Sequence, residues 1–162
     1  MGERARAAPL YTDAERRRRD ASGWTLVQGV LAPIQFLVFL VSLVLVLRYF
    51  ATGEGAFAAT VSVVVKTACL YAIMVTGCLW EKDVFGQYLF APAFFWEDVV
   101  SMGVIALHTA YLVALVTGAL DTRGQLALAL AAYATYAVNA AQFLVKFRAA
   151  RRMPRSALVA AE

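Results

Sequence analysis

The sequence is short of charge, cysteine and histidine. Of its 162 residues, 16% are charged and 62% are hydrophobic, with two cysteines and one histidine. An ordinary soluble domain is roughly 45–50% apolar and about 25% charged, and a small globule cannot bury so large an apolar surplus. The composition therefore argues against a disordered chain, a disulfide-rich secreted module and a basic nucleic-acid-binding domain. It indicates an integral membrane protein.

The few cysteines and the single histidine also restrict the chemistry. Cys69 and Cys78 are nine residues apart. On one helix they would point about 180° apart and lie roughly 13 Å apart along the axis, so they cannot form a disulfide within the chain. The sequence shows no Cys/His spacing typical of a metal site. His108 alone cannot supply both axial ligands of a bis-histidine haem, so a haem-binding membrane subunit would need a site shared between protomers.

Four long apolar stretches are present, at residues 24–47, 56–80, 95–120 and 125–147. Each reaches the ~20 residues that a helix needs to cross a hydrocarbon core of about 30 Å. Lipid offers the backbone no hydrogen-bond partners, so each stretch should be helical. The short connectors are 48–55, 81–94 and 121–124. We therefore predict an all-α integral membrane protein, with a four-transmembrane-helix bundle over residues 24–147 and short loops.

The ends of the chain are basic. The first 23 residues are polar and are not typical of a cleavable signal peptide. Thr12 and Glu15 match a capping box, which predicts a short interfacial helix that carries Arg16–Arg19.

The distribution of positive charge predicts the orientation. If the N-terminus is inside, 12 of the 15 lysines and arginines lie on the cytoplasmic side, Arg48 and Arg123 lie outside, and Lys66 lies within a span. The positive-inside rule then places both termini, residues 1–23 and 148–162, in the cytoplasm. Anionic lipid headgroups, rather than nucleic acid, are the expected partner of the basic runs.

Polar side chains within the spans fall into two layers. Ionisable groups there are costly, so each requires a reason. Gln35, Lys66 and His108 lie near the middle of the membrane. The cytoplasmic half contains Gln28, Glu81, Glu97, Asp98, Ser101, Asn139 and Gln142. Because the outer half is almost purely apolar, we expect a polar cavity that opens toward the cytoplasm.

Helical phase groups these side chains further. Gln28, Gln35 and Ser42 repeat every seven residues and share one stripe, and Glu97, Ser101 and His108 line one face of the third span. Asp98 points about 100° away from Glu97, so the two carboxylates need not be equivalent. The amides could instead only join helices, the carboxylates could favour the helix N-terminus, and His108 could be a packing residue.

The connector before the third span is aromatic. It contains Phe85, Tyr88, Phe90, Phe94, Phe95 and Trp96, interrupted by Pro92. The cluster fits an interfacial aromatic belt, and equally a flat hydrophobic mouth for a large planar ligand.

Several segments resemble the 3-vinyl (bacterio)chlorophyllide hydratase family of phototrophic bacteria. They are residues 16–20 (RRRRD), 24–33 (WTLVQGVLAP), 90–102 (FAPAFFWEDVVSM), 107–111 (LHTAY) and 133–136 (YATY). The resemblance extends over about residues 9–150 and is most specific in the FFWEDVVSM run. It implies hydration of the C3 vinyl group of a chlorin or bacteriochlorin to a 1-hydroxyethyl group, in bacteriochlorophyll a synthesis.

Such a hydration would begin with protonation of the terminal vinyl carbon and end with water capturing the ring-stabilised cation. It requires an acid, a positioned water and a base, but no cofactor. The catalytic candidates are Glu97, Asp98 and His108. His108 could be the base or an axial ligand to the substrate's magnesium. The substrate-binding candidates are Gln28, Gln35, Lys66, Trp96, Ser101, Asn139 and Gln142.

Other cations and other functions remain open. Lys66 could hold the carboxylates in place, and Lys82, Lys146 or Arg148 could pair with the substrate's propionate. A non-catalytic pigment carrier or assembly factor, or a haem-binding membrane subunit, is the alternative. A channel or transporter fits less well because the outer half has no continuous polar path. A homo-oligomer and contacts with neighbouring pathway enzymes are both compatible with the sequence.

Overall fold

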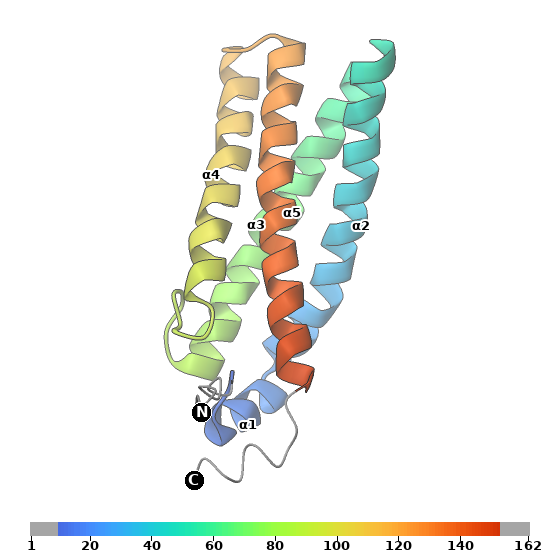
Figure 1. The fold of residues 1–162 in the computed structure, drawn as a ribbon. Helices are drawn as coiled ribbons and strands as arrows, with labels where there is room; N and C mark the ends of the chain where they lie inside the picture. The colour runs from blue at the N-terminus through green and yellow to red at the C-terminus, as the bar shows by residue number, and fades with distance from the viewer. Residues whose placement is uncertain (1–9, 153–162) are drawn as a thin grey trace, which may run out of the picture.

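Five helices make up the part of the chain that the structure, a computed structural model, describes, which is residues 10–152. They are α1 (Asp13–Ala21), α2 (Gly23–Thr52), α3 (Ala56–Phe85), α4 (Phe95–Thr117) and α5 (Thr122–Arg152). The four long helices run side by side, and α1 lies at the end of the bundle where α3 and α5 finish (Figure 1). The prediction of an all-α bundle is confirmed. The predicted basic terminal segments include residues 1–9 and 153–162, which lie outside the described residues.

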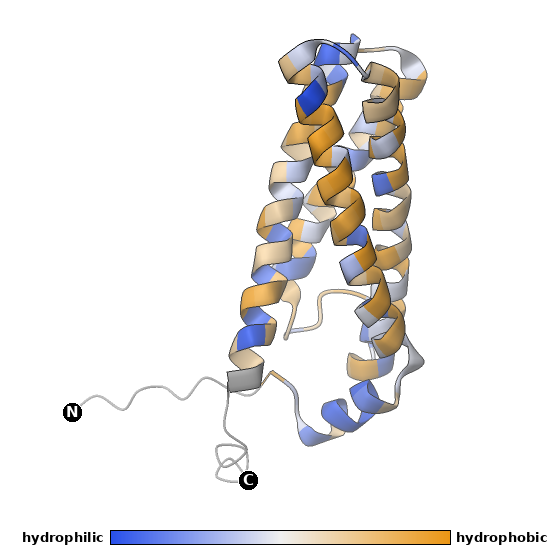
Figure 2. Ribbon diagram, turned by 90° about the vertical axis from the view of Figure 1, so that its right-hand side faces the viewer, coloured by the Kyte–Doolittle hydropathy of each residue, from blue (hydrophilic) through white to orange (hydrophobic). Residues whose placement is uncertain are grey.

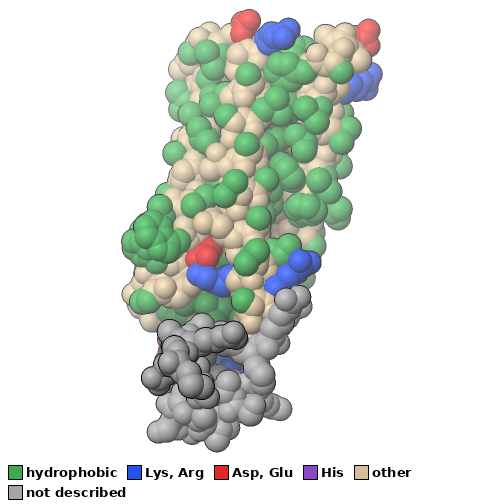
Figure 3. Space-filling view, viewed as in Figure 1, with side chains coloured by type: hydrophobic (Ala, Val, Ile, Leu, Met, Phe, Trp, Pro, Cys, Tyr) green, Lys and Arg blue, Asp and Glu red, His purple; other side chains and the backbone are tan. Residues whose placement is uncertain are grey.

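All four long helices are long and apolar enough to cross a membrane. Hydrophilic residues concentrate in α1 and at the helix ends (Figure 2). On the face drawn in Figure 3, charged side chains lie near the two ends, with a broad hydrophobic belt between them. The chain is therefore a multi-pass membrane protein.

Three of the helices extend beyond the predicted apolar stretches. For example, α2 continues to Thr52 and α3 to Phe85, because a helix need not end where the hydrocarbon core ends. Both stop at a glycine in the left-handed conformation: Gly53 has φ of 75° and Gly86 has φ of 83°. By contrast, α4 ends early, at Thr117, because Gly118 adopts the same conformation.

The long helices form two pairs. The most extensive contacts are between α2 and α3 and between α4 and α5, and those between the pairs are sparser. Small residues such as Ala59 and Ala129 are fully buried in the core of the bundle, where small side chains let helices approach closely. The sparser packing between the pairs leaves room for a cavity near α1.

The predicted capping box begins α1. Glu15 N donates to Thr12 Oγ1 over 3.2 Å, and Thr12 N donates to Glu15 Oε2 over 2.7 Å. Arg18 Nε fixes the helix to the end of α3 by donating to the Val84 carbonyl over 2.8 Å. Just before α1, Tyr11 is buried against Phe85, and this burial raises the pKa of its phenol to about 12. Thus α1 is a fixed part of the fold.

Candidate active site

A cavity of about 1280 Å³ lies between the helix pairs at the α1 end of the bundle. It exceeds the roughly 300–1,000 Å³ of ordinary small-molecule sites, and apolar side chains make up most of its wall. Six residues of the two polar layers in the sequence line it: Gln28, Gln35, Glu81, Asp98, Ser101 and Asn139. A cavity is therefore present at the end of the bundle that carries the basic helix, but its wall is mostly apolar, and its opening toward the cytoplasm stays a prediction.

Two carboxyl groups meet in this cavity, one from each helix pair. Glu81 on α3 and Asp98 on α4 are both buried, and their carboxyl groups lie close enough to share one proton in a hydrogen bond. A hydrogen bond between two carboxyl groups requires that one of them carry a proton, because an ionised carboxylate can only accept. The pair therefore combines a proton donor with a proton acceptor.

The aromatic connector holds both carboxyl groups in place. Phe90 N donates to Asp98 Oδ2 over 2.7 Å, and Ala91 N donates to Glu81 Oε2 over 3.3 Å. Phe90 has a φ of 60°, unusual for a residue other than glycine, which marks the sharp bend that aims these two amides at the pair. The connector thus fixes the distance between α3 and α4 at the site.

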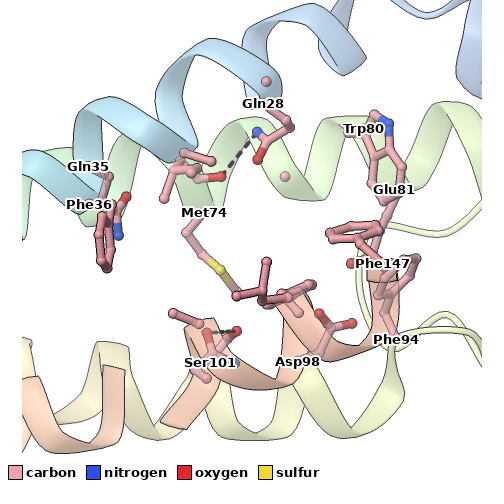
Figure 4. A pocket seen from close by; sticks show the side chains of 18 of the residues that line it. Gln28, Gln35, Phe36, Met74, Trp80, Glu81, Phe94, Asp98, Ser101 and Phe147 are labelled. Atoms are coloured by element: carbon pink, nitrogen blue, oxygen red, sulfur yellow. Dashed lines mark hydrogen bonds between the residues drawn. The ribbon is translucent and has the colours of Figure 1, made fainter. Parts of the chain in front are cut away.

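Aromatic rings surround the same end of the cavity. Figure 4 shows Glu81 and Asp98 close to Trp80, Phe94 and Phe147, whereas Gln35 and Phe36 lie at the opposite end. The ring centroids of Trp80 and Phe94 are 5.6 Å apart, and those of Phe94 and Phe147 are 5.8 Å apart. The cluster therefore forms part of a cavity wall that suits a flat apolar ligand.

Glu97 does not line the large cavity, so the two neighbouring carboxylates have different surroundings, as their helical phase allows. Its Oε2 accepts from Lys146 Nζ on α5 over 2.5 Å, and the same ammonium donates to the Ala93 carbonyl over 2.5 Å. Glu97 and Gln142 line a separate pocket of about 670 Å³. Glu97 thus joins α4 to α5 instead of facing the large cavity.

Lys66 lies fully buried behind the deep end of the cavity. Its Nζ is 3.7 Å from the centre of the Tyr136 ring. With the Gln35 amide oriented to satisfy its neighbours, its oxygen accepts from Lys66 Nζ and its nitrogen donates to the Cys69 carbonyl, both over 3.2 Å. The expectation that Lys66 holds the carboxylates is not met. It precedes Glu81 by 15 residues on α3, a separation of about 22 Å along the helix.

The remaining candidates are dispersed. His108 is fully buried, with Nδ1 2.8 Å from the Val104 carbonyl oxygen, and it does not line the large cavity. Trp96 is 69% exposed on the outside of α4. Gln28 donates to Thr76 Oγ1 over 2.6 Å, and Asn139 donates to the Glu97 carbonyl over 2.9 Å. These two amides therefore join helices and also line the cavity.

Glu81 is the functional candidate that the sequence did not assign to the site. Its place in the cytoplasmic polar layer was the available signal, but it directly follows the apolar stretch that ends at Trp80. Only the fold of the connector brings Glu81 to Asp98, which is 17 residues away in the chain.

Fold and site together define a multi-pass membrane protein with a buried carboxyl pair in a large, mostly apolar cavity. Such a site is suited to acid–base chemistry on a hydrophobic ligand. The family model described as 2-vinyl bacteriochlorophyllide hydratase (BCHF) matches residues 11–149. The chain belongs to this family and is a hydratase of bacteriochlorophyll biosynthesis, as the resemblance implied.

Two curated relatives carry the same name, 2-vinyl bacteriochlorophyllide hydratase. The protein from Cereibacter sphaeroides is 68% identical over 149 residues, which cover 90% of this chain and 92% of the relative. The protein from Rhodobacter capsulatus is 69% identical over 142 residues, which cover 88% of this chain and 82% of the relative. No solved structure matches the chain.

Proposed function

We propose that the chain adds water to the vinyl group of a bacteriochlorophyllide and that Glu81 and Asp98 transfer the protons. The vinyl group in the relatives' names is numbered 2 in one convention for the macrocycle and C3 in another. The observation that carries the proposal is the buried pair of neighbouring carboxyl groups, held by the Phe90 and Ala91 amides, inside a cavity of about 1280 Å³. The size and apolar wall of the cavity suit a planar macrocycle.

In the proposed reaction the protonated carboxyl group gives its proton to the terminal vinyl carbon. The π electrons of the double bond form the new C–H bond, and the inner carbon becomes a cation conjugated with the macrocycle. The ionised carboxylate of the pair stabilises this cation. The oxygen of a water molecule then bonds to the inner carbon, and the carboxylate takes the released proton. The pair ends with one proton, as it began.

This scheme needs no cofactor, because adding water to a double bond is neither a net oxidation nor a net reduction. The magnesium belongs to the substrate. Asp98 keeps the catalytic role expected from the sequence, and Glu81 takes the place of Glu97. Ser101 and Asn139 offer a hydroxyl and an amide that can orient the water. No step is assigned to His108, whose ring lies outside the cavity lining.

We further propose that the α1 end of the bundle faces the cytoplasm of the inner membrane. The basic residues of α1 and Arg148 near the end of α5 lie at this end, and Arg16 and Arg19 of α1 line the cavity there. A hydrophobic pigment would therefore enter from the cytoplasmic side.

The test is hydration by membranes that contain Glu81→Gln or Asp98→Asn. Each substitution keeps the size of the side chain but removes its carboxyl group, so turnover should fall about 10²- to 10⁴-fold at equal protein level. Glu54→Gln and Asp83→Asn are the matched controls, because both side chains are exposed and neither lines the cavity. They should retain wild-type turnover.

Two results would contradict the proposal. Full turnover by both cavity variants would exclude the carboxyl pair as the proton donor and acceptor. A wild-type protein that binds the vinyl pigment without converting it would favour the pigment-carrier alternative.

A further inference from the structure

The basic helix α1 contributes two guanidinium groups to the lining of the cavity. Arg16 and Arg19 lie three residues apart on one face of α1, and both line the cavity, whereas their neighbour Arg17 is exposed and does not. Charged side chains are rare in this wall, and Arg16 and Arg19 are the basic ones among the described residues that line it.

The two guanidinium groups differ in their partners. Arg19 donates to Asp20 Oδ1 from Nε over 2.8 Å and from Nη2 over 2.6 Å. Its Cζ also lies 4.9 Å from the centre of the Tyr11 ring. Arg16 is half-buried and forms no ion pair with any residue in the range 10–152. Arg16 therefore presents a positive charge to the cavity that the described residues leave uncompensated.

The helix that carries Arg16 is held next to the carboxyl pair. Arg18, two residues on, donates to the carbonyl of Val84, which lies one turn after Glu81 on α3. Thr25 Oγ1 donates to the Arg19 carbonyl over 2.6 Å and accepts from Trp80 Nε1 over 3.0 Å. Arg16 is thus fixed at the same end of the cavity as the proposed proton donor.

The cations first considered for the substrate's acid group are occupied or remote. Lys146 is paired with Glu97, and Lys82 donates to the Gly86 carbonyl over 2.9 Å. Arg148 is exposed, and neither it nor Lys82 lines the cavity. Among the described residues, Arg16 is the candidate whose position and charge both fit.

We propose that Arg16 binds the propionate carboxylate of the substrate, so that the enzyme selects the pigment as its free acid and rejects the ester. This inference rests on the proposed hydration. In a chlorophyllide the propionate lies on the ring next to the one that bears the vinyl group. One end of the cavity can therefore hold both groups together. A guanidinium matches the two oxygens of a carboxylate with paired hydrogen bonds, and Arg19 adds a second, partly compensated charge.

The test compares two substrates, the vinyl pigment with a free propionate and the same pigment with its propionate methylated. The wild-type protein should hydrate the free acid with a kcat/KM about 10- to 100-fold above that of the ester. Arg16→Ala should lower kcat/KM for the free acid by a similar factor, mainly through KM, and leave the ester nearly unchanged. Arg16→Lys should restore part of the preference. Arg17→Ala, which removes the same charge from the exposed side of α1, should leave it intact.

The outcomes separate this inference from the hydration itself. Equal hydration of the two pigments by the wild type would overturn the role of Arg16 and leave the hydratase activity standing. So would an equal loss on both pigments in Arg16→Ala, which is the result expected if Arg16 holds a lipid phosphate or only stabilises α1. Failure of the wild type to hydrate either pigment would contradict the proposed function, and this inference with it.

Discussion

Removing the ammonium of Lys146 should destabilise the protein more than removing the charge of Glu97. Lys146 donates both to Glu97 and to the Ala93 carbonyl, so Lys146→Met loses two charge-assisted hydrogen bonds at the start of α4. Glu97→Gln loses only the charge, because the amide oxygen can still accept from Lys146. The second substitution is therefore the milder perturbation.

The exposure of the pair sets the size of the effect. The Glu97 side chain is 8% exposed and the Lys146 side chain is 27% exposed. Breaking a fully buried pair costs about 3–5 kcal/mol, and an exposed pair contributes about 0–1 kcal/mol. We therefore expect Lys146→Met to lower the free energy of unfolding by about 2–3 kcal/mol and Glu97→Gln by about 1–2 kcal/mol. The coupling between the two should be about 1–2 kcal/mol.

The assay is a double-mutant cycle in detergent micelles, with unfolding by dodecyl sulfate followed by circular dichroism. Arg148→Met is the control, because Arg148 is exposed on the same helix and should change the free energy of unfolding by less than about 0.5 kcal/mol. Additive effects, or a Lys146→Met variant as stable as the wild type, would refute the reasoning. Loss of hydration by fully folded Glu97→Gln would show instead that Glu97 takes part in the chemistry.

Three further substitutions test other parts of the structure. Gly86→Ala should lower the free energy of unfolding by about 1–2 kcal/mol, because Gly86 has a φ of 83° and begins the turn toward the carboxyl pair. Gly103→Ala is the control, because nothing lies within 4 Å of the added methyl group, and it should leave the free energy of unfolding unchanged or raise it. Equal losses of stability at both glycines would contradict the role of backbone strain at Gly86. Lys66→Met should raise KM for the pigment, because Gln35 and Tyr136 at the deep end of the cavity lose their contact with the ammonium. It should leave the free energy of unfolding unchanged or higher, since a buried charge is costly, and an unchanged KM in steady-state kinetics would remove Lys66 from the substrate site.

The bundle could be predicted from the sequence because lipid imposes a strong pattern. Apolar stretches of about 20 residues admit only helices in a membrane. The capping box at Thr12 and Glu15 depends on residues three apart, so local sequence was sufficient there too. Helix ends were less predictable, because α2 and α3 continue past their apolar stretches until Gly53 and Gly86 reverse the chain.

The site was only partly predictable. Helical phase separated Asp98 from Glu97, because the angle between neighbouring residues is fixed within one helix. Phase within one helix carries no information about a partner on another. The contact of Asp98 with Glu81 depends on the Phe90 and Ala91 amides, and the contact of Glu97 with Lys146 depends on how α5 packs on α4.

The carboxyl pair is tested most directly by removing both of its acids. Membranes that contain the wild type or the Glu81→Gln/Asp98→Asn double variant, at equal protein level, are incubated with 3-vinyl bacteriochlorophyllide, and the pigment is examined by mass spectrometry. We predict a product heavier by one water from the wild type, and unconverted vinyl pigment from the double variant. Hydration by the double variant at the wild-type rate would contradict the account.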